Sequence, residues 1–255
     1  MITYLLFIFF QRRGSVTKII LSDIRWDYIF NPQLALESIP FVLEGLSYTI
    51  AISLLSFILS LIGGTILALM RISRSRLLRI LARFYVSFFR GVPVLVTLFF
   101  LYFGLPLANL MLTAIQASVL GFGLTSSAYS SEIIRSAIES IDKGQWEAAQ
   151  SLGLNRRKVL RKIIFPQATR IAIPALSNVL LDLVKGSSLT AMITVPEIFQ
   201  KAKIVGGANN DYMTMYFLIA IIYWIICVIY GFLQDYLERL YKPDQITPLS
   251  KRMSP

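Results

Sequence analysis

Residues 91–131 form a run of 41 amino acids without a single Asp, Glu, Lys or Arg. The hydrocarbon core of a bilayer is about 30 Å thick, and an α-helix needs about 20 apolar residues to cross it. The run is therefore too long for one crossing and has the length of two. Gly104 and Pro106 lie near its middle, and both residue types favour a turn. We expect two spans, at about 84–107 and 112–135.

Three further runs have the length of a membrane-spanning helix. They predict spans at about 45–70, 171–193 and 212–234, and only the second of the three contains charged residues. The sequence thus predicts an all-α integral membrane protein with five transmembrane helices, whose transmembrane domain covers residues 44–240.

Composition argues against other classes of protein. Hydrophobic residues make up 56% of the chain and charged residues 15%, with a mean hydropathy of +0.66. A soluble domain has about 25% charged residues, so this chain has too few charges to cover a water-exposed surface, and its apolar excess argues against disorder. The chain has no His and one cysteine, Cys227, which leaves no intramolecular disulfide and no multi-cysteine metal site. An intramembrane enzyme is disfavoured because the acidic residues are well separated.

The charges predict an orientation. The chain carries 25 Lys and Arg against 14 Asp and Glu, a net charge of +11. In a soluble protein this excess would indicate nucleic acid, but in an apolar chain it indicates basic loops on the cytoplasmic side of a lipid bilayer. Most of the basic residues fall in 71–83, in 135–170 and after 234. We therefore expect the N-terminus outside and the C-terminus inside, and no nucleic-acid partner.

The two ends of the chain are expected to lie outside the transmembrane domain. Residues 1–43 are predicted to be an extracytoplasmic or interfacial segment, and residues 241–255 a cytoplasmic tail. The apolar stretch Ile2–Phe10 would rise only about 14 Å as a helix, which is too short to cross the bilayer. It is either an interfacial start or a truncated sixth span.

The loop at 138–170, between the third and fourth predicted spans, contains helix-capping signals. Gln145–Leu152 are good helix formers, and Gly153 suits the left-handed position just past a helix end. Asn155 can cap a second helix, which Pro166 is expected to end. A compact pair of helices, small on one side and basic on the other, is suited to docking on another protein. A solvated connector is the alternative.

A motif in this loop resembles a known family. Glu147-Ala148-Ala149 is followed at fixed spacing by Gly153, Ile163 and Pro166. This pattern resembles the EAA loop of binding-protein-dependent ABC-importer permeases, with Phe165 where that family usually has Leu. In that family the loop is the coupling helix that sits in a cleft of the cytoplasmic ATPase subunit. The resemblance implies an ATPase-coupling role for Glu147, Ala148, Ala149, Gly153, Ile163 and Pro166.

Two further motifs extend the resemblance over about residues 40–240 and narrow it to the polar amino-acid uptake branch. They are Arg90-Gly91-Val92-Pro93 and the segment from Ser127 to Arg135. Lys185-Gly186-Ser187-Ser188-Leu189 departs from the commoner Lys-Asp-Thr-Ser-Leu and, together with Ala191–Glu197 and Lys201–Gly207, is most similar to the L-cystine-importing members. The resemblance implies the type I importer (MetI-like) permease fold, a bacterial cytoplasmic membrane and an imported polar amino acid, L-cystine first and arginine, glutamine or glutamate as alternatives. An ion-coupled secondary carrier usually shows inverted repeats, and we find no convincing internal repeat.

The resemblance also implies that the transport machinery is divided among subunits. The chain has no Gly-rich phosphate-binding loop of the GxxxxGK[S/T] type, so it is not expected to bind ATP. A separate ATPase dimer would bind ATP and Mg, an extracytoplasmic solute-binding protein would deliver the substrate, and a second permease subunit, identical or paralogous, would complete the pathway. We expect no cofactor in this chain and no enzymatic activity of its own.

Two pairs of charges fall within predicted spans. Asp182 and Lys185 are three residues apart on one helix face, where they form either an intrahelical ion pair or a site for a zwitterion, because an unpaired charge at this depth costs several kcal/mol. Glu132 and Arg135 form a second such pair, expected to be a gate or a structural tie, and Arg90 is expected to have a structural role or to reach the headgroups.

The substrate-pathway candidates are Asp182, Lys185, Ser187, Ser188, Ser126 and Tyr129. Serine in a membrane helix more often bonds its own backbone, which favours a structural role for Ser187 and Ser188. Gly63-Gly64 in the first span predicts a close helix contact.

Overall fold

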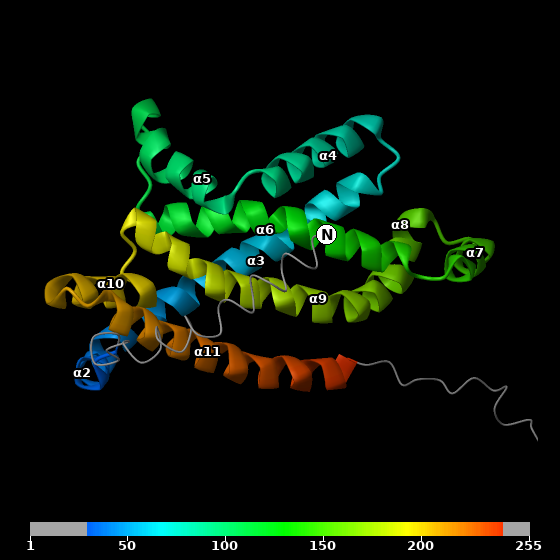
Figure 1. The fold of residues 1–255 in the computed structure, drawn as a ribbon. Coiled ribbons are helices and arrows are strands. Elements are labelled where there is room, and N and C mark those ends of the chain that lie inside the picture. Colours follow the sequence, from blue (N-terminus) through cyan, green and yellow to red (C-terminus); the bar gives the residue numbers. More distant parts are fainter. Residues whose placement is uncertain (1–29, 242–255) are drawn as a thin grey trace, which may run out of the picture.

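The computed structural model describes residues 30–241, with side chains described to residue 236. Every regular element in this part of the chain is helical (Figure 1). The helices are α2 (Pro32–Leu43), α3 (Leu46–Arg71), α4 (Arg76–Gly91), α5 (Val94–Phe99), α6 (Ala114–Glu139), α7 (Lys143–Ser151), α8 (Arg156–Val159), α9 (Phe165–Gly186), α10 (Ile198–Asn209) and α11 (Tyr212–Tyr241). The predictions for Ile2–Phe10 and for the tail after residue 241 lie outside the described residues.

The long helices α3, α6, α9 and α11 form the body of the molecule (Figure 1). α2 and α10 lie at one end, and α7 and α8 lie at the other (Figure 1). In the described part of the chain, three helical runs are long and apolar enough to cross a membrane: Leu46–Arg71, Arg156–Ile193 and Tyr212–Tyr236. They cover the predicted first, fourth and fifth spans. A bent helix pair would make a fourth.

The predicted span at 84–107 is not one straight helix. α4 ends at Gly91 and α5 begins at Val94, and the two are bent by 101°. The break lies at Val92 and Pro93, whose backbones are extended with ψ angles of 130° and 135°. Proline disfavours the helical conformation in the residue before it and has no N–H to continue the helix. The Arg90-Gly91-Val92-Pro93 motif is therefore a helix break.

The turn between the second and third predicted spans lies later than Gly104 and Pro106. Helix continues past α5 through a π-helical turn, η2 (Phe100–Gly104), and a 3₁₀ turn, η3 (Leu105–Ala108). Asn109 then ends it in the left-handed conformation, with φ 60°. α6 begins after Thr113, whose side chain accepts from the Gln116 backbone N–H.

Pro166 does not end a helix, contrary to prediction. α8, the π-helical turn η4 (Leu160–Ile164), α9 and the 3₁₀ turn η5 (Ser187–Ile193) form one run of 38 residues. Pro166 lies in the first turn of α9, where its missing N–H costs little. The wider turn before it supplies the hydrogen bond from the Phe165 N–H to the Leu160 carbonyl. The helical run that contains the fourth predicted span therefore begins well before residue 171.

α3 and α6 pack closely through small residues, as Gly63-Gly64 predicts. A Cβ added to Gly64 would lie 2.6 Å from the Ser130 Cβ, and one added to Gly63 would lie 2.4 Å from the Ser127 Oγ. The hydroxyls of Ser60 and Ser130 share a 2.8 Å hydrogen bond across the same contact. The close contact that the glycines permit is therefore made within this chain, to α6.

A buried carboxylate organises the α2–α10 end. Glu197 is fully buried and caps α10, accepting from the backbone N–H groups of Phe199 (2.9 Å) and Gln200 (2.8 Å) and from the Tyr223 hydroxyl (2.8 Å). Burial raises the pKa of Glu197 above its usual 4.5, and the three donors oppose that shift. Lys201 binds Glu44 at 2.7 Å, which ties α10 to the segment between α2 and α3.

Candidate functional site

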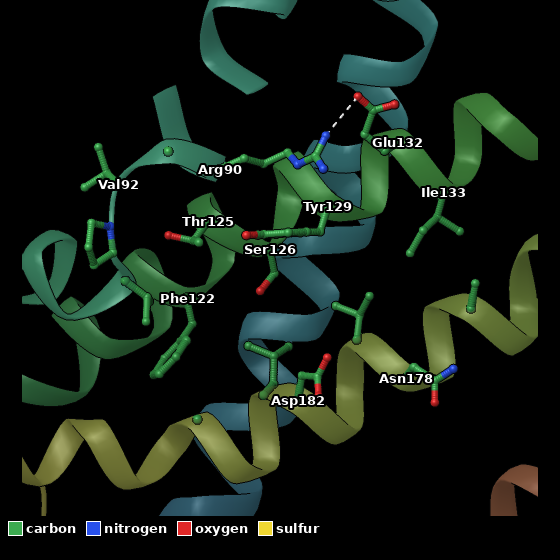
Figure 2. Close-up of a pocket in the computed structure, with 17 residues that line it drawn as sticks. Arg90, Val92, Phe122, Thr125, Ser126, Tyr129, Glu132, Ile133, Asn178 and Asp182 are labelled. Carbon is green, nitrogen blue, oxygen red and sulfur yellow. Dashed lines mark hydrogen bonds and ion pairs between the residues drawn. The ribbon is translucent and has the colours of Figure 1, made fainter. Parts of the chain in front are cut away.

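A cavity of about 850 Å³ lies beside the break between α4 and α5, where α6 and α9 face each other (Figure 2). We call it the central cavity. Arg90 and Glu132 lie on its α4–α6 side, and Asp182 and Asn178 lie on its α9 side (Figure 2). Its lining includes Arg90, Val92, Thr125, Ser126, Tyr129, Glu132, Asn178 and Asp182.

The polar lining of the central cavity comes from elements far apart in sequence. Because Val92 and Pro93 interrupt the helix, the end of α4 brings Arg90 to the cavity wall. α6 contributes Ser126 and Tyr129, two of the predicted pathway residues. The buried hydroxyl of Thr125 has no hydrogen-bond partner within residues 30–241. A cavity with both signs of charge and hydroxyl groups suits a small zwitterionic or polar solute.

Glu132 is the centre of an ion-pair cluster. Its carboxylate binds the guanidinium groups of Arg71 (2.8 Å), Arg90 (3.3 Å) and Arg135 (2.9 Å). Arg135 also pairs with Glu139. The predicted pair of Glu132 and Arg135 is present, and the cluster additionally joins α3, α4 and α6.

Arg90 pairs with Glu132 (Figure 2), and its guanidinium carbon also lies 5.5 Å from the centre of the Tyr129 ring, within the range of a cation–π contact. Its side chain is 47% exposed, against 14% for Arg71 and 27% for Arg135. Arg90 is therefore the most accessible of the three arginines, and it faces the central cavity.

A second cavity, of about 590 Å³, adjoins the cluster, and we call it the end cavity. Arg135, Ser136 and Ser140 line it near the C-terminal end of α6, which leads to α7. The two cavities share a small set of lining residues: Arg90, Glu132, Ile133 and Ala175.

The predicted pair of Asp182 and Lys185 is present, with the carboxylate and ammonium 3.0 Å apart. The pair is exposed to solvent, since the side chain of Asp182 is 74% exposed and that of Lys185 is 51% exposed in the single chain. Asp182 lines the central cavity, and Lys185 is not among its lining residues. The zwitterion site predicted from these two residues therefore lacks its cation at the cavity, and Arg90 is the cation found there.

Ser187 and Ser188, two of the predicted pathway residues, do not line the central cavity. The Ser187 hydroxyl is buried and donates to the Val184 carbonyl at 2.8 Å, and Ser188 donates to the Lys185 carbonyl at 2.8 Å. Both serines bond their own helix, which is the structural role that we favoured for them.

The 138–170 loop contains the predicted pair of short helices, α7 and α8. Gly153 has φ +77°, and its N–H donates to the Gln150 carbonyl at 2.9 Å. Asn155 caps α8 by accepting from the Lys158 N–H at 2.9 Å. The loop therefore has a defined turn at Gly153.

The six predicted coupling residues differ in exposure. Glu147, Ala148, Gly153 and Pro166 are exposed. Ala149 is buried in a core cluster with Val159 and Ile164, and Ile163 packs against that cluster. The side chains of Ala149 and Ile163 thus hold the loop together, and Glu147 and Ala148 form the outward surface of α7.

Some residues of the site are missing from the sequence prediction. Arg71 follows the first apolar run, where the sequence predicts only a basic loop residue, yet it makes the shortest contact to Glu132. Thr125 and Asn178 line the central cavity but carry no charge that would distinguish them in a helix. The described residues contain no cluster of Cys, Asp and Glu that could hold a metal ion.

Comparisons with known proteins give a consistent result. A family model described as "Binding-protein-dependent transport system inner membrane component" matches residues 60–243. The chain is 54% identical over 221 residues to the "Probable amino-acid ABC transporter permease protein YckA" of Bacillus subtilis (strain 168), covering 87% of this chain and 98% of that protein. It is 43% identical over 201 residues to the "L-cystine transport system permease protein TcyB" of the same organism, and the match covers 78% of this chain and 86% of that protein.

A solved structure agrees with these relatives. The chain matches the "Crystal structure of an amino acid ABC transporter with histidines" with a TM-score of 0.76 and 32% sequence identity. The match covers 80% of this chain and 95% of the solved one. The helical arrangement described above is therefore that of an ABC-transporter permease.

Proposed function

The chain belongs to the family of binding-protein-dependent transport system inner membrane components, and from that premise we propose that it is the permease subunit of an ABC importer for a polar amino acid. Permease subunits are not enzymes, and ATP hydrolysis belongs to a partner. The observation that most strongly supports this proposal is the central cavity, which has Arg90 on one wall and Asp182 on the opposite wall.

In the membrane, we place five spans with the N-terminus outside and the C-terminus inside, in a bacterial cytoplasmic membrane. The span that hydropathy alone does not identify is the third, α6, which is 26 residues long but rich in serine and glycine. Its polar face is compatible with the bilayer because 14 of its residues are buried against neighbouring helices. The basic residues near α7 and α8 support the cytoplasmic placement of that end.

The central cavity is proposed as the substrate site. Arg90 would bind the α-carboxylate, since guanidinium matches carboxylate geometry, and Asp182 would bind the α-ammonium. Thr125, Ser126, Tyr129 and Asn178 supply hydrogen-bonding groups along the wall. L-cystine is the first substrate to test, because of the similarity to TcyB and the Lys185–Leu189 segment.

The exposed surface of α7 is proposed to dock on a separate ATPase dimer, and an extracytoplasmic binding protein and a second permease subunit, identical or paralogous, would complete the importer. Glu147 and Ala148 are the exposed residues of the α7 motif, on a helix whose base is fixed by buried Ala149. ATP and Mg would bind the ATPase and not this chain.

The test is uptake into proteoliposomes that contain the permease, its ATPase and its binding protein. Radiolabelled L-cystine, L-arginine, L-glutamine and L-glutamate are supplied in turn, with and without internal ATP. ATP-dependent accumulation of one of them is expected. Accumulation driven by an ion gradient without ATP would instead identify a secondary carrier, and no accumulation of any amino acid would refute the proposal.

A matched pair of variants tests the role of Asp182. Asp182→Asn and Lys185→Gln break the same 3.0 Å ion pair, but only Asp182 lines the central cavity. We expect Asp182→Asn to lower uptake about tenfold or more, the scale of one lost charge-assisted contact. Lys185→Gln should lower it much less. Equal losses in both variants would show that the ion pair, and not the cavity carboxylate, is what transport requires.

A further inference from the structure

The three ion pairs of Glu132 differ in length and in exposure to solvent. Arg71 and Arg135 lie 2.8 and 2.9 Å from the carboxylate, whereas Arg90 lies 3.3 Å away and is the most exposed of the three. Exposed ion pairs are weaker than enclosed ones because water screens them. The contact between Arg90 and Glu132 is therefore the one that another carboxylate can most readily replace.

Loss of Arg90 would leave Glu132 compensated. An ion pair whose partner is removed is costly when it leaves a charge alone in a poorly solvated site. Here Arg71 and Arg135 both remain in contact with the Glu132 carboxylate. A cluster with three arginines around one carboxylate thus permits one arginine to leave without stranding the anion.

The contact between Arg90 and Glu132 lies at the boundary between the two cavities. Arg90 and Glu132 line both the central cavity and the end cavity, so they lie between the two. Arg90 belongs to α4 and Glu132 to α6, and their ion pair joins those helices just before the break at Val92 and Pro93 (Figure 2). Separation of the pair would remove the ion pair between α4 and α6 at the boundary between the cavities.

We propose that the substrate's α-carboxylate takes Arg90 from Glu132, and that this carboxylate exchange removes the ion pair between the end of α4 and α6 and opens the central cavity to the end cavity. The proposal rests on the proposed function, because it requires an amino acid in the central cavity. Arg90 is then both a substrate ligand and one half of a gate, and Glu132 is a competitor of the substrate.

Competition predicts opposite effects from removing the two partners. Without the arginine the substrate carboxylate loses its ligand, so Arg90→Gln should weaken binding about tenfold or more. Without the competing carboxylate the arginine is free, so Glu132→Gln should tighten binding by about two- to fivefold, the scale of an exposed ion pair. A purely structural ion pair predicts the same direction for both, because both variants break it.

The measurement is equilibrium binding of radiolabelled L-cystine, L-arginine, L-glutamine and L-glutamate, each in turn, to the purified permease–ATPase complex without the binding protein. Omitting the binding protein matters because its own affinity would otherwise determine the signal. Glu139→Gln is the matched control, since it removes a carboxylate of α6 that pairs with Arg135 and not with Arg90. It should change affinity by less than about twofold.

The outcomes separate the two proposals. If the wild-type complex binds one amino acid but Arg90→Gln and Glu132→Gln shift its affinity in the same direction, the exchange is refuted and the proposed function stands. If the wild-type complex neither binds nor transports any of the four, both proposals fail. Should Glu132→Gln not fold, Glu132→Asp keeps a carboxylate in the cluster on a side chain one methylene shorter, which lengthens the contact to Arg90, already the longest of the three at 3.3 Å. A smaller tightening is then expected, and weaker binding in Glu132→Asp would also overturn the exchange.

Discussion

Gly64→Ala tests the close packing between α3 and α6. The added Cβ would lie 2.6 Å from the Ser130 Cβ and 3.1 Å from the Ser131 backbone N. Carbon atoms pack at about 3.5–4.0 Å, so the two helices must move apart by about 1 Å. Such overpacking costs about 1–3 kcal/mol, and the better helix propensity of alanine offsets about 1 kcal/mol of it. We expect a net loss of about 0–2 kcal/mol relative to the wild type, and of about 1–3 kcal/mol relative to a Gly→Ala change that meets no neighbour.

The assay uses the one cysteine of the chain. Cys227 is partly buried in α11, so a fluorogenic thiol reagent reports unfolding of the detergent-purified protein on heating. The expected loss corresponds to a fall of up to about 8 °C in the apparent melting temperature. Gly231→Ala is the control, because nothing lies within 4 Å of its added Cβ and only the propensity gain remains. The packing argument is wrong if Gly64→Ala melts at or above the temperature of Gly231→Ala.

Three further predictions concern the coupling surface and the buried carboxylate. Gly153→Val should reduce ATPase stimulation by the loaded binding protein, because φ +77° costs a β-branched residue at least about 1–2 kcal/mol, while Gly153→Asn should retain most of it; equal activity in both would contradict this. Glu147→Lys should abolish ATP-driven uptake and leave membrane insertion normal. The control variant Gln145→Lys, on the opposite side of α7, should retain uptake. Normal uptake by Glu147→Lys would refute the proposed docking surface. Because burial raises the pKa of Glu197, the folded state binds a proton more tightly than the unfolded state. The stability of the wild type relative to Glu197→Gln should therefore fall as the pH rises from 4.5 through the raised pKa, and a difference in melting temperature that does not change with pH would contradict this.

The loop helices could be predicted because their signals are local. Gly153 takes the left-handed conformation and Asn155 caps α8 through its own side chain, and both follow from backbone geometry over a few residues. The long apolar runs that became α3 and α11 are equally local, because length and hydropathy define them.

The prolines show where local rules fail. Pro93 breaks a helix and Pro166 does not, although both lie in long helical stretches. At Pro166 the preceding π-helical turn supplies an alternative hydrogen bond, from Phe165 to Leu160, and the helix continues. At Pro93 two consecutive residues are extended, and the chain bends. The difference lies in the hydrogen bonds that surround each proline, which residue type alone does not specify.

The candidate site was only partly predictable because its partners come from different helices. Spacing of three residues identifies Glu132 with Arg135 and Asp182 with Lys185, and both pairs form. Spacing contains no information on Arg71 and Arg90, which reach Glu132 from α3 and α4. The zwitterion-site alternative therefore takes its cation from Lys185, the basic residue nearest to Asp182 in the sequence.

The least apolar of the long helices is the one that the site needs most. α6 does not meet the hydropathy of a membrane span, yet its small polar residues are buried against α3, and Ser130 bonds Ser60 across that contact. The same composition supplies the cavity with Thr125 and Ser126, and places Glu132 within reach of three arginines. A more apolar α6 would pass a hydropathy test and would lose both the close packing and the polar wall. The low hydropathy of α6 is thus a consequence of its central position: lipid contact requires apolar side chains, whereas a helix enclosed by other helices can use polar ones for packing and for transport.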